Sequence, residues 1–372
     1  MGALGVDREP VEPAQRPVRS APGRVVRAQG RRHHDRIPAA RSASGRRPHR
    51  GAAHRRQEHV NAEAALRDVP LGGHTTALLG VDDGKYPDAN GLLVVGDERT
   101  VLIEPTLGVR RRIEAGDLAG HRPEEIDAVL LSHVHEDHVP ALPLLPDADC
   151  WVHEDDRGGL DDLDAFLDLY GLPEPARAEF RELCIERFHY APRPRARDFA
   201  DGHRWDLGGV VVQALHTPGH TPGHCFFVVQ PDEVVYLGDF DLSTFGPYYG
   251  DVGGSVDDFL RTCERASTLD ARWYVTGHHK AIVEGRERFL EMCSRYASVI
   301  AQREERLLEM LAEPLDIDEI ASRRLIYRSH DEGLFVDTVE RRAATLHLER
   351  LERSGLVQRL SGDRKRFVAS TV

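Results

Sequence analysis

Short apolar runs separated by polar turns dominate the chain from about residue 71 onward. Their length and their content of Val, Ile, Leu and aromatic residues are typical of buried strands. We expect strands at residues 75–79, 92–95, 100–103, 126–131, 150–153, 210–215, 226–230, 234–237 and 273–276. Two neighbouring pairs, 92–95 with 100–103 and 226–230 with 234–237, are spaced as hairpins.

Longer segments with helical periodicity lie between these runs. Residues 160–170 and 174–188 have helical spacing of apolar positions, whereas 109–119 is helical or irregular. Ser255 followed by Asp258 resembles a helix N-cap, which predicts a helix to about residue 269. A long helix is predicted from about residue 285 to 311.

The end of the chain has a different pattern. Asp316 and Glu319 have the spacing of a capping box, and a longer helix is expected over 337–354 with Gly355 ending it. Two short strands, 356–360 and 366–369, follow. Helix, helix and two-stranded wing is the order of a winged-helix domain.

The first 60 residues contain 14 Arg, no Lys, 5 acids and 6 Pro, and they are nearly free of large apolar side chains. Such a segment cannot bury enough surface to fold. We interpret residues 1–60 as a disordered tail, or as translated upstream sequence. A transit peptide or a nucleic-acid-binding arm is less consistent with this composition.

Composition narrows the class of protein. The formal net charge is −13, so the remainder of the chain is strongly acidic, which argues against a protein that binds nucleic acid over its whole surface. No apolar run approaches the roughly 20 residues of a membrane helix. The five cysteines are scattered and odd in number, which favours reduced thiols and a cytoplasmic location.

Candidate metal ligands gather directly after the strand predicted at 126–131. Within Leu131–His138 stand His133, His135, Asp137 and His138. His133 and His135 are two positions apart, so on an extended backbone their side chains point the same way. Imidazole and carboxylate are both accepted zinc ligands.

Three more such residues follow other predicted strands, each in a glycine-containing loop: His220, Asp239 and His278. Strands of a layered α/β fold deliver side chains to one shared edge, so we expect all seven to meet. Seven ligands are too many for one tetrahedral zinc. They fit two metals, with His133, His135 and His220 on one, Asp137, His138 and His278 on the other, and Asp239 bridging.

Neighbouring polar residues compete for these roles. Asp241 is an alternative bridge, although Gly238 before Asp239 favours the latter. We expect His224 and His279 to support ligands or lie on the surface, and His216 to orient another group.

Four motifs together resemble the metallo-β-lactamase superfamily: His133-x-His135-x-Asp137-His138, Pro218-Gly219-His220-Thr221, Gly238-Asp239 and Gly277-His278. The resemblance implies an α/β (α+β) fold, a four-layer αβ/βα sandwich over residues 70–312. It also implies two metal ions, usually zinc with iron or manganese as alternatives, and a hydroxide that bridges them. Residues 313–372 resemble the C-terminal winged-helix domain of some members. Glu104 stands where the family commonly has Asp, and its longer side chain could keep the supporting role of that residue.

The expected function is hydrolysis of a small-molecule ester, thioester or lactone by the metal-bridging hydroxide. Asp137 is the expected catalytic residue, which orients the hydroxide and carries a proton to the leaving atom. Tyr248 and Tyr249, in the loop after Asp239, are candidates for contacting the substrate.

Two alternatives stay open. A nuclease or phosphodiesterase would use the winged helix, since residues 339–368 hold 8 Lys or Arg and 4 acids. A non-enzymatic metal-sensing regulator is the other. The expected partner is therefore a small-molecule substrate, with nucleic acid as the less favoured alternative, no membrane, and a homodimer contact through the winged helix left open.

Overall fold

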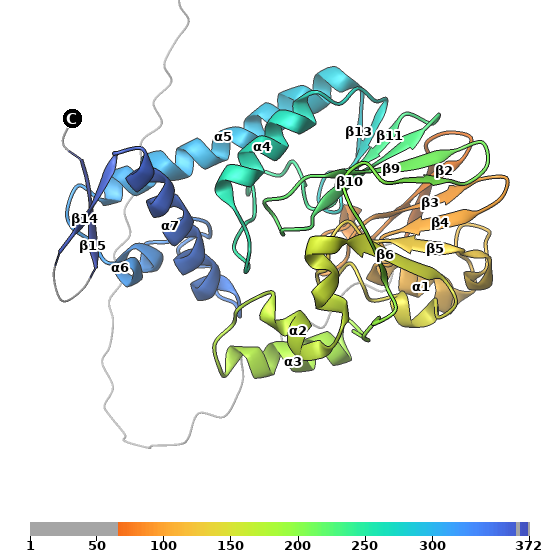
Figure 1. Ribbon diagram of the computed structural model, residues 1–372, viewed down its shortest axis with the longest axis horizontal. Coiled ribbons are helices and arrows are strands. Elements are labelled where there is room, and N and C mark those ends of the chain that lie inside the picture. Colours follow the sequence, from red (N-terminus) through yellow and green to blue (C-terminus); the bar gives the residue numbers. More distant parts are fainter. Residues whose placement is uncertain (1–65, 362–364, 371–372) are drawn as a thin grey trace, which may run out of the picture. The chain divides into compact units, whose positions relative to one another are not determined.

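The computed structural model, which describes residues 66–361 and 365–370, contains two large β-sheets that lie next to each other (Figure 1). The first is a seven-stranded sheet in sequence order, antiparallel from β1 to β4 and parallel from β4 to β7. Its strands are β1 (Arg67–Pro70), β2 (Thr75–Leu79), β3 (Gly91–Val95), β4 (Thr100–Ile103), β5 (Ala128–Leu130), β6 (Asp149–His153) and β7 (Arg197–Phe199).

The second sheet has six strands in the order β13-β12-β11-β10-β9-β8. They are β8 (Arg204–Asp206), β9 (Val211–His216), β10 (Cys225–Gln230), β11 (Val234–Tyr236), β12 (Trp273–Val275) and β13 (Ile282–Glu284). Strand β10 is antiparallel to both β9 and β11, and β11 is parallel to β12. The carboxyl ends of β9, β11 and β12 therefore lie at the same edge of this sheet.

Helices cover the outer faces of both sheets. In chain order the α-helices are α1 (Leu107–Ala115), α2 (Leu163–Asp168), α3 (Ala176–Glu186), α4 (Val256–Ser267), α5 (Arg286–Met310), α6 (Ile317–Ser322) and α7 (Val336–Arg353). Short 3-10 helices occupy Val81–Asp83, Pro123–Glu125, Leu142–Leu144 and Glu154–Leu160. The predicted caps are present: Ser255 accepts from Asp258 N, and Asp316 forms a capping box with Glu319.

Three apolar cores separate four layers. Alternate residues of each strand point to opposite faces, so Leu92 of β3 packs between the sheets while Leu93 faces α1–α3. In β10, Phe227 packs between the sheets and Phe226 packs toward α4 and α5. This helix–sheet–sheet–helix arrangement is the predicted αβ/βα sandwich, and the fold class is confirmed.

The C-terminal elements share a fourth core with the end of α5. Leu307 and Leu311 pack against α6, α7 and the two-stranded sheet of β14 (Val357–Leu360) and β15 (Arg366–Ala369). Helix α7 also contacts the layers before it, because Ala343 belongs to the core that α4 and α5 cover. The predicted helices and two-stranded wing are present, whereas the winged-helix assignment and the boundary at residue 313 stay predictions.

The differences from the sequence-based elements are local. Strands β1, β7, β8 and β13 have three or four residues each and were not predicted. The helix predicted over 160–170 is shorter, because Asp162 caps a new helix by accepting from Ala165 N. The predicted disordered tail at 1–60 lies outside the described residues.

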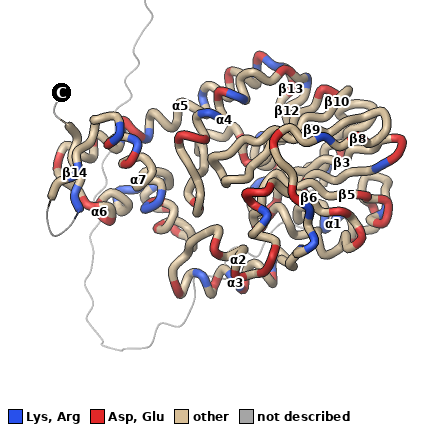
Figure 2. The backbone as a smooth tube through the Cα atoms, viewed as in Figure 1, with Lys and Arg blue, Asp and Glu red and all other residues tan. Residues whose placement is uncertain are grey.

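Acidic and basic positions are interspersed along much of the described chain, as Figure 2 shows, although short helices such as α2 and α6 carry acidic charges only. Within the part of the chain that the structure describes, none of the helices is both long and apolar enough to cross a membrane.

Candidate metal centre

The loop after β5 supplies four of the seven predicted ligands. Strand β5 is fully buried, and the chain continues through Leu131 into the His133–His138 string, whose candidate ligands are all at most 5% exposed. The backbone N–H of Cys225 in the second sheet donates to the carbonyl of Ser132 at 2.8 Å. The loop is therefore held at the edge where the two sheets meet.

The second sheet supplies the other three from the carboxyl ends of β9, β11 and β12. Two glycines make the approach possible. Gly219, at φ 129°, lies so close to α4 that a Cβ would be 2.5 Å from the backbone N of Phe259. Gly238, at φ 50°, precedes Asp239, and a Cβ there would be 2.5 Å from His224 Nε2. Both positions favour glycine for its backbone freedom and for its small size.

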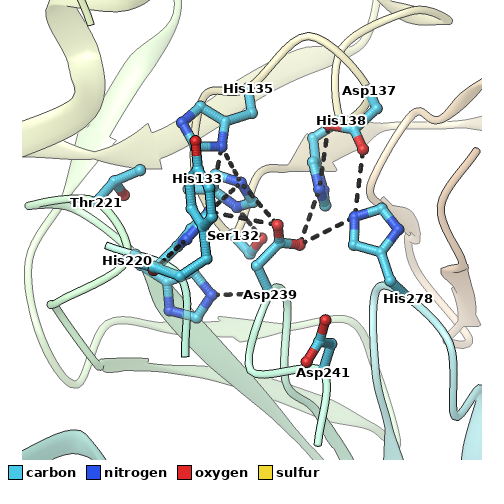
Figure 3. A network of polar contacts seen from close by, with 12 residues as sticks. Ser132, His133, His135, Asp137, His138, His220, Thr221, Asp239, Asp241 and His278 are labelled. Carbon is cyan, nitrogen blue, oxygen red and sulfur yellow. Dashed lines mark hydrogen bonds and ion pairs between the residues drawn. The ribbon is translucent and has the colours of Figure 1, made fainter. Parts of the chain in front are cut away.

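Three histidines form the first group, as Figure 3 shows. The distance from His133 Nε2 to His135 Nδ1 is 3.1 Å, from His135 Nδ1 to His220 Nε2 3.1 Å, and from His220 Nε2 to His133 Nε2 3.2 Å. Three ring nitrogens at nearly equal separations, each at most 5% exposed, are placed as three corners of a tetrahedral site.

A second group lies on the other side of Asp239. His278 Nε2 is 3.2 Å from Asp137 Oδ2, and His138 Nε2 is 3.6 Å from Asp137 Oδ1. Asp239 Oδ1 faces this group, at 3.0 Å from His138 and 3.3 Å from His278. Its other oxygen, Oδ2, faces the first group at 3.3 Å from His220 Nε2. One carboxylate thus points one oxygen at each group.

Each of the five histidines has its remaining ring nitrogen beside a protein oxygen. Such partners fix the tautomer and the orientation of a ligating imidazole. Four of them are hydrogen-bonded pairs: His133 Nδ1 with Ser132 Oγ at 2.9 Å, His138 Nδ1 with Glu104 Oε2 at 2.8 Å, His220 Nδ1 with Tyr248 O at 3.0 Å, and His278 Nδ1 with Gly84 O at 2.7 Å. The fifth, His135 Nε2, lies 3.4 Å from Asp251 Oδ2 without forming a hydrogen bond.

The electrostatics of the cluster suit cations. Burial lowers the pKa of His133, His135 and His220, which favours the neutral imidazole that binds a metal. Burial opposes charge on His138 as well, but nearby carboxylates outweigh it and raise its pKa well above the usual value. Burial also opposes ionisation of Asp239, yet His278 and His138 outweigh it and hold the pKa of that carboxyl well below its usual range.

The donor set therefore fits metal ions. His138 Nε2 and Asp239 Oδ1 are buried and lie 3.0 Å apart, yet they are not aligned as a hydrogen bond, and neither has another hydrogen-bond partner among the described residues. Leaving both atoms unsatisfied is costly unless a cation binds them. His133, His135, His220 and Asp239 offer one ligand atom each within 4.8 Å of one another, and so do Asp137, His138 and His278. The seven predicted residues thus lie together, in the two groups expected.

Glu104 takes a supporting position. Its Oε1 accepts from the backbone N–H of Ser132 at 2.5 Å, and its Oε2 holds His138. The residue adopts φ 64° after β4 and is fully buried. The longer side chain, where the family commonly has Asp, reaches both the loop and the ring.

The competing residues lie around the cluster. His224 Nε2 accepts from the backbone N–H of Asp239 at 3.1 Å, so it positions that residue. Asp241 faces His279 at 3.8 Å rather than the two groups. His216 stacks on His153 away from the cluster, with ring centroids 4.0 Å apart.

A cavity of about 290 Å³ opens onto both groups. Tyr248 lines it, and its hydroxyl donates to Asp251 Oδ1 at 3.3 Å. Tyr249 does not line it, which corrects the expectation that it contacts substrate. The Tyr249 side chain is 1% exposed, and its hydroxyl lies 2.7 Å from Arg303 Nη1 and 2.8 Å from His347 Nε2, inside the core.

Several lining residues were not predicted as site residues. Glu136 lies within the histidine string, and its carboxylate accepts from Tyr170 Oη at 2.6 Å and Tyr86 Oη at 2.9 Å. Burial raises the pKa of Glu136 to about 7. Tyr327 and Phe335 reach the cavity from the segment between α6 and α7. Glu136 has a sequence signal, because it lies between His135 and Asp137. Tyr327 and Phe335 have none, because only the tertiary fold brings these two rings to the cavity.

Comparison with known proteins agrees with this geometry. Residues 87–278 match the model of the metallo-beta-lactamase superfamily, which is more than half of the chain. The chain belongs to the metallo-β-lactamase superfamily. Its fold is therefore that of a superfamily of enzymes, whose members are generally hydrolases. Its histidines and aspartates form groups that could hold metal ions.

Three relatives illustrate the range of similarity. An uncharacterized protein of Mycobacterium leprae (strain TN) is 33% identical over 168 residues, which are 43% of this chain and 72% of that protein. An atrochrysone carboxyl ACP thioesterase of Aspergillus fumigatus is 27% identical over 243 residues, 62% of this chain and 65% of that protein. The solved structure of a beta-lactamase domain protein from Burkholderia ambifaria is 18% identical and shares the fold, with a TM-score of 0.62 over 82% of this chain and 93% of that one.

Proposed function

We propose that this protein is a dinuclear metal-dependent hydrolase of carboxylic thioesters, esters or lactones. The observation that carries the proposal is the carboxylate of Asp239, which directs one oxygen to each of the two ligand groups. His133, His135 and His220 would hold one ion, Asp137, His138 and His278 the other, and Asp239 both. Zinc suits these nitrogen and oxygen donors, and iron or manganese are the alternatives.

A bound pair of metal ions would supply hydroxide at neutral pH and polarise the acyl oxygen. The chain supplies placement and proton transfer. Asp137 lines the cavity, so its carboxylate can accept the proton of the attacking water and deliver it to the leaving atom. In thioester hydrolysis a C–O bond forms at the acyl carbon, the C–S bond breaks, and the sulfur leaves with that proton as a thiol.

The cavity lining favours an uncharged acyl group. The rings of Tyr86, Tyr170, Phe245, Tyr248, Tyr327 and Phe335 line it, together with several carboxylates, and no Lys or Arg of the described chain does. An aromatic wall stabilises apolar or aromatic groups by burial. Carboxylates at the wall disfavour a phosphodiester beside the metal ligands, because like charges repel. The similarity to an ACP thioesterase supports a thioester among the acyl classes.

Tyr248 is the side chain we propose to contact the substrate from the loop after Asp239. Burial raises the pKa of its hydroxyl well above the usual value, so the group stays a hydrogen-bond donor. It is therefore suited to donating to the acyl oxygen as negative charge develops there, in exchange for its bond to Asp251 Oδ1.

A substrate panel tests the proposal. The full chain, with its metal content measured, is assayed against chromogenic thioester, lactone, β-lactam and phosphodiester substrates. We expect turnover of an acyl substrate that a chelator abolishes and zinc restores. Turnover of the phosphodiester alone, with nucleic-acid affinity that falls steeply with salt, would instead indicate a nuclease. Two bound metals with no turnover of any substrate would indicate a regulator.

A further inference from the structure

A second cavity, of about 390 Å³, lies beside the one that holds the metal ligands. It is bordered by α5 and by the segment that follows α6, and three guanidinium groups line it: Arg303 and Arg306 from α5, and Arg328. Asp331 is the acid in its lining. The cavity is therefore rich in positive charge, in a chain whose formal net charge is −13.

The guanidinium groups of these arginines are not paired with carboxylates in the described chain, and the carboxylate of Asp331 accepts instead from the backbone N–H of Arg328 at 2.8 Å. Among the described residues, none of the three forms an ion pair within 4.0 Å, whereas Arg324 pairs with Asp337 and Arg350 pairs with Asp257 and Glu304. Arg303 is 2% exposed and donates only to uncharged oxygens, including Phe245 O at 2.7 Å and Tyr249 Oη at 2.7 Å. A buried guanidinium without a counter-ion is costly, and an anionic ligand would offset that cost.

The two cavities share one wall. Phe245 lines both, and its ring contacts that of Tyr327 with centroids 5.5 Å apart. Tyr327 faces the metal cavity while the next residue, Arg328, faces the arginine cavity. An elongated ligand that crosses the Phe245–Tyr327 pair would thus reach the metal ligands with one end and the guanidiniums with the other.

We propose that the arginine cavity binds the phosphate of a 4′-phosphopantetheine arm whose acyl thioester lies at the metal ligands. This inference rests on the proposed function and names the carrier of the acyl group. The arm has a phosphate at one end, two amides along an uncharged chain and the thioester at the other end. Arginine matches phosphate by paired hydrogen bonds, and Thr244 and Gln302 of the same cavity can bond to amides.

The position of the arginines excludes the phosphate as the group that is hydrolysed. They line a cavity to which none of the seven candidate ligands contributes. A phosphate bound there anchors the substrate equally in the ground state and the transition state. Such uniform binding lowers KM and leaves kcat unchanged.

Matched substrates test the proposal with the metal-loaded full chain. We compare S-benzoyl-pantetheine with S-benzoyl-4′-phosphopantetheine, which differ by the phosphate alone. The expected result is a KM about tenfold lower for the phosphorylated substrate, with similar kcat. Equal KM values for the two substrates would overturn the proposal.

Variants locate the effect. Arg328→Gln and Arg306→Gln, both at exposed positions, are expected to remove most of the preference for the phosphorylated substrate and to leave KM for the other unchanged. Arg295→Gln is the control, because Arg295 is also exposed on α5 but pairs with Glu291 outside the cavity. An equal loss of preference in the control would contradict the assignment, and so would variants that raise KM for both substrates alike.

A binding measurement separates this inference from the proposed function. Calorimetric titration with 4′-phosphopantetheine, pantetheine and inorganic phosphate needs no turnover. We expect 4′-phosphopantetheine to bind more tightly than either fragment, and Arg328→Gln to weaken it. Binding no tighter than that of inorganic phosphate would overturn the inference. Tight binding without hydrolysis of any thioester, ester or lactone would overturn the proposed function and leave the arginine cavity assigned.

The same phosphate can come from two carriers. Benzoyl-coenzyme A and benzoyl-phosphopantetheine attached to an acyl carrier protein present it on a small molecule and on a protein surface. The carrier whose benzoyl thioester is hydrolysed faster is the source of the phosphate, provided that Arg328→Gln removes the difference in rate between the two carriers. Hydrolysis of free S-benzoyl-4′-phosphopantetheine without hydrolysis of either carrier-bound thioester would contradict the proposal that the cavity binds the arm of a carrier.

Discussion

Two clusters of histidine and aspartate lie among the described residues, and they differ in how their ring nitrogens are bonded. In the metal centre, each of five rings has one nitrogen beside a protein oxygen and turns the other toward the shared space. The second cluster contains His153, Asp155 and His216, whose ligand atoms also lie within 4.8 Å of one another. There His216 Nε2 is bonded to the carbonyl of Pro222 at 2.7 Å, and Asp155 is 52% exposed.

Histidine and aspartate side chains that lie close together are therefore not sufficient to indicate a metal site. The two rings of the second cluster stack at 9° to one another, an arrangement in which they pack rather than converge. The metal centre is distinguished by supports on the far side of each ring. These supports orient the ligands before a metal arrives, which reduces the cost of ordering them on binding.

The largest expected effect comes from removing a ligand. His133→Ala should lower the metal content from about two ions per chain to about one and abolish turnover, because three nitrogens of one group become two. His216→Ala in the second cluster should leave both quantities unchanged. Metal analysis by mass spectrometry checks the pair. Full metal content in His133→Ala, or a loss of metal in His216→Ala, would contradict the distinction between the metal centre and the second cluster.

The next effect separates chemistry from metal binding. Asp137→Asn removes the carboxylate that we expect to move the proton, so turnover should fall roughly 10²- to 10⁴-fold. The amide oxygen can still bind, so the variant should retain part of its metal. The measurement is kcat together with metal content on the same sample. Turnover near that of the unaltered chain would remove Asp137 from the catalytic role.

A smaller effect is expected from a supporting residue. Glu104→Gln keeps the shape of the side chain but weakens its bond to His138, and metal affinity should fall about 10- to 100-fold. Asp155→Asn is the corresponding change in the second cluster and should not alter affinity. Competition with a chromogenic chelator measures both. Equal affinities in Glu104→Gln and the unaltered chain would show that the support is dispensable.

The smallest effect concerns the backbone that carries Asp239. Gly238→Ala places a Cβ against His224 at φ 50° and should lower the free energy of unfolding by about 1–3 kcal/mol. Gly116→Ala, at φ 78° with nothing within 4 Å of the added carbon, should cost about 1 kcal/mol or less. Denaturant unfolding of both variants gives the difference. Equal losses would show that the contact with His224 is unimportant.

Much of the fold and the site could be predicted from the sequence, because both depend on local pattern. The hairpin of β3 and β4 and the capping box of α6 have local signals in residue order. The seven polar residues were recognisable because each follows an apolar strand, and strand ends of a layered fold converge.

The remainder depends on packing between distant segments. Strands β7, β8 and β13 have three residues each, too few for a periodic pattern. Tyr248 and Tyr249 are neighbours in the same loop, yet only Tyr248 lines the cavity because Arg303 and His347 hold the hydroxyl of Tyr249. The reach of Tyr327 into the cavity depends on how α7 packs against the core of α4 and α5.

The central claim is that two cations are held on either side of the Asp239 carboxylate. Anomalous X-ray scattering from crystals of the zinc-loaded protein locates them directly. We predict two peaks, one among His133, His135 and His220 and one among Asp137, His138 and His278, with a different oxygen of Asp239 bound to each. A single peak, or a peak at His153 and His216 with none at Asp239, would contradict the account.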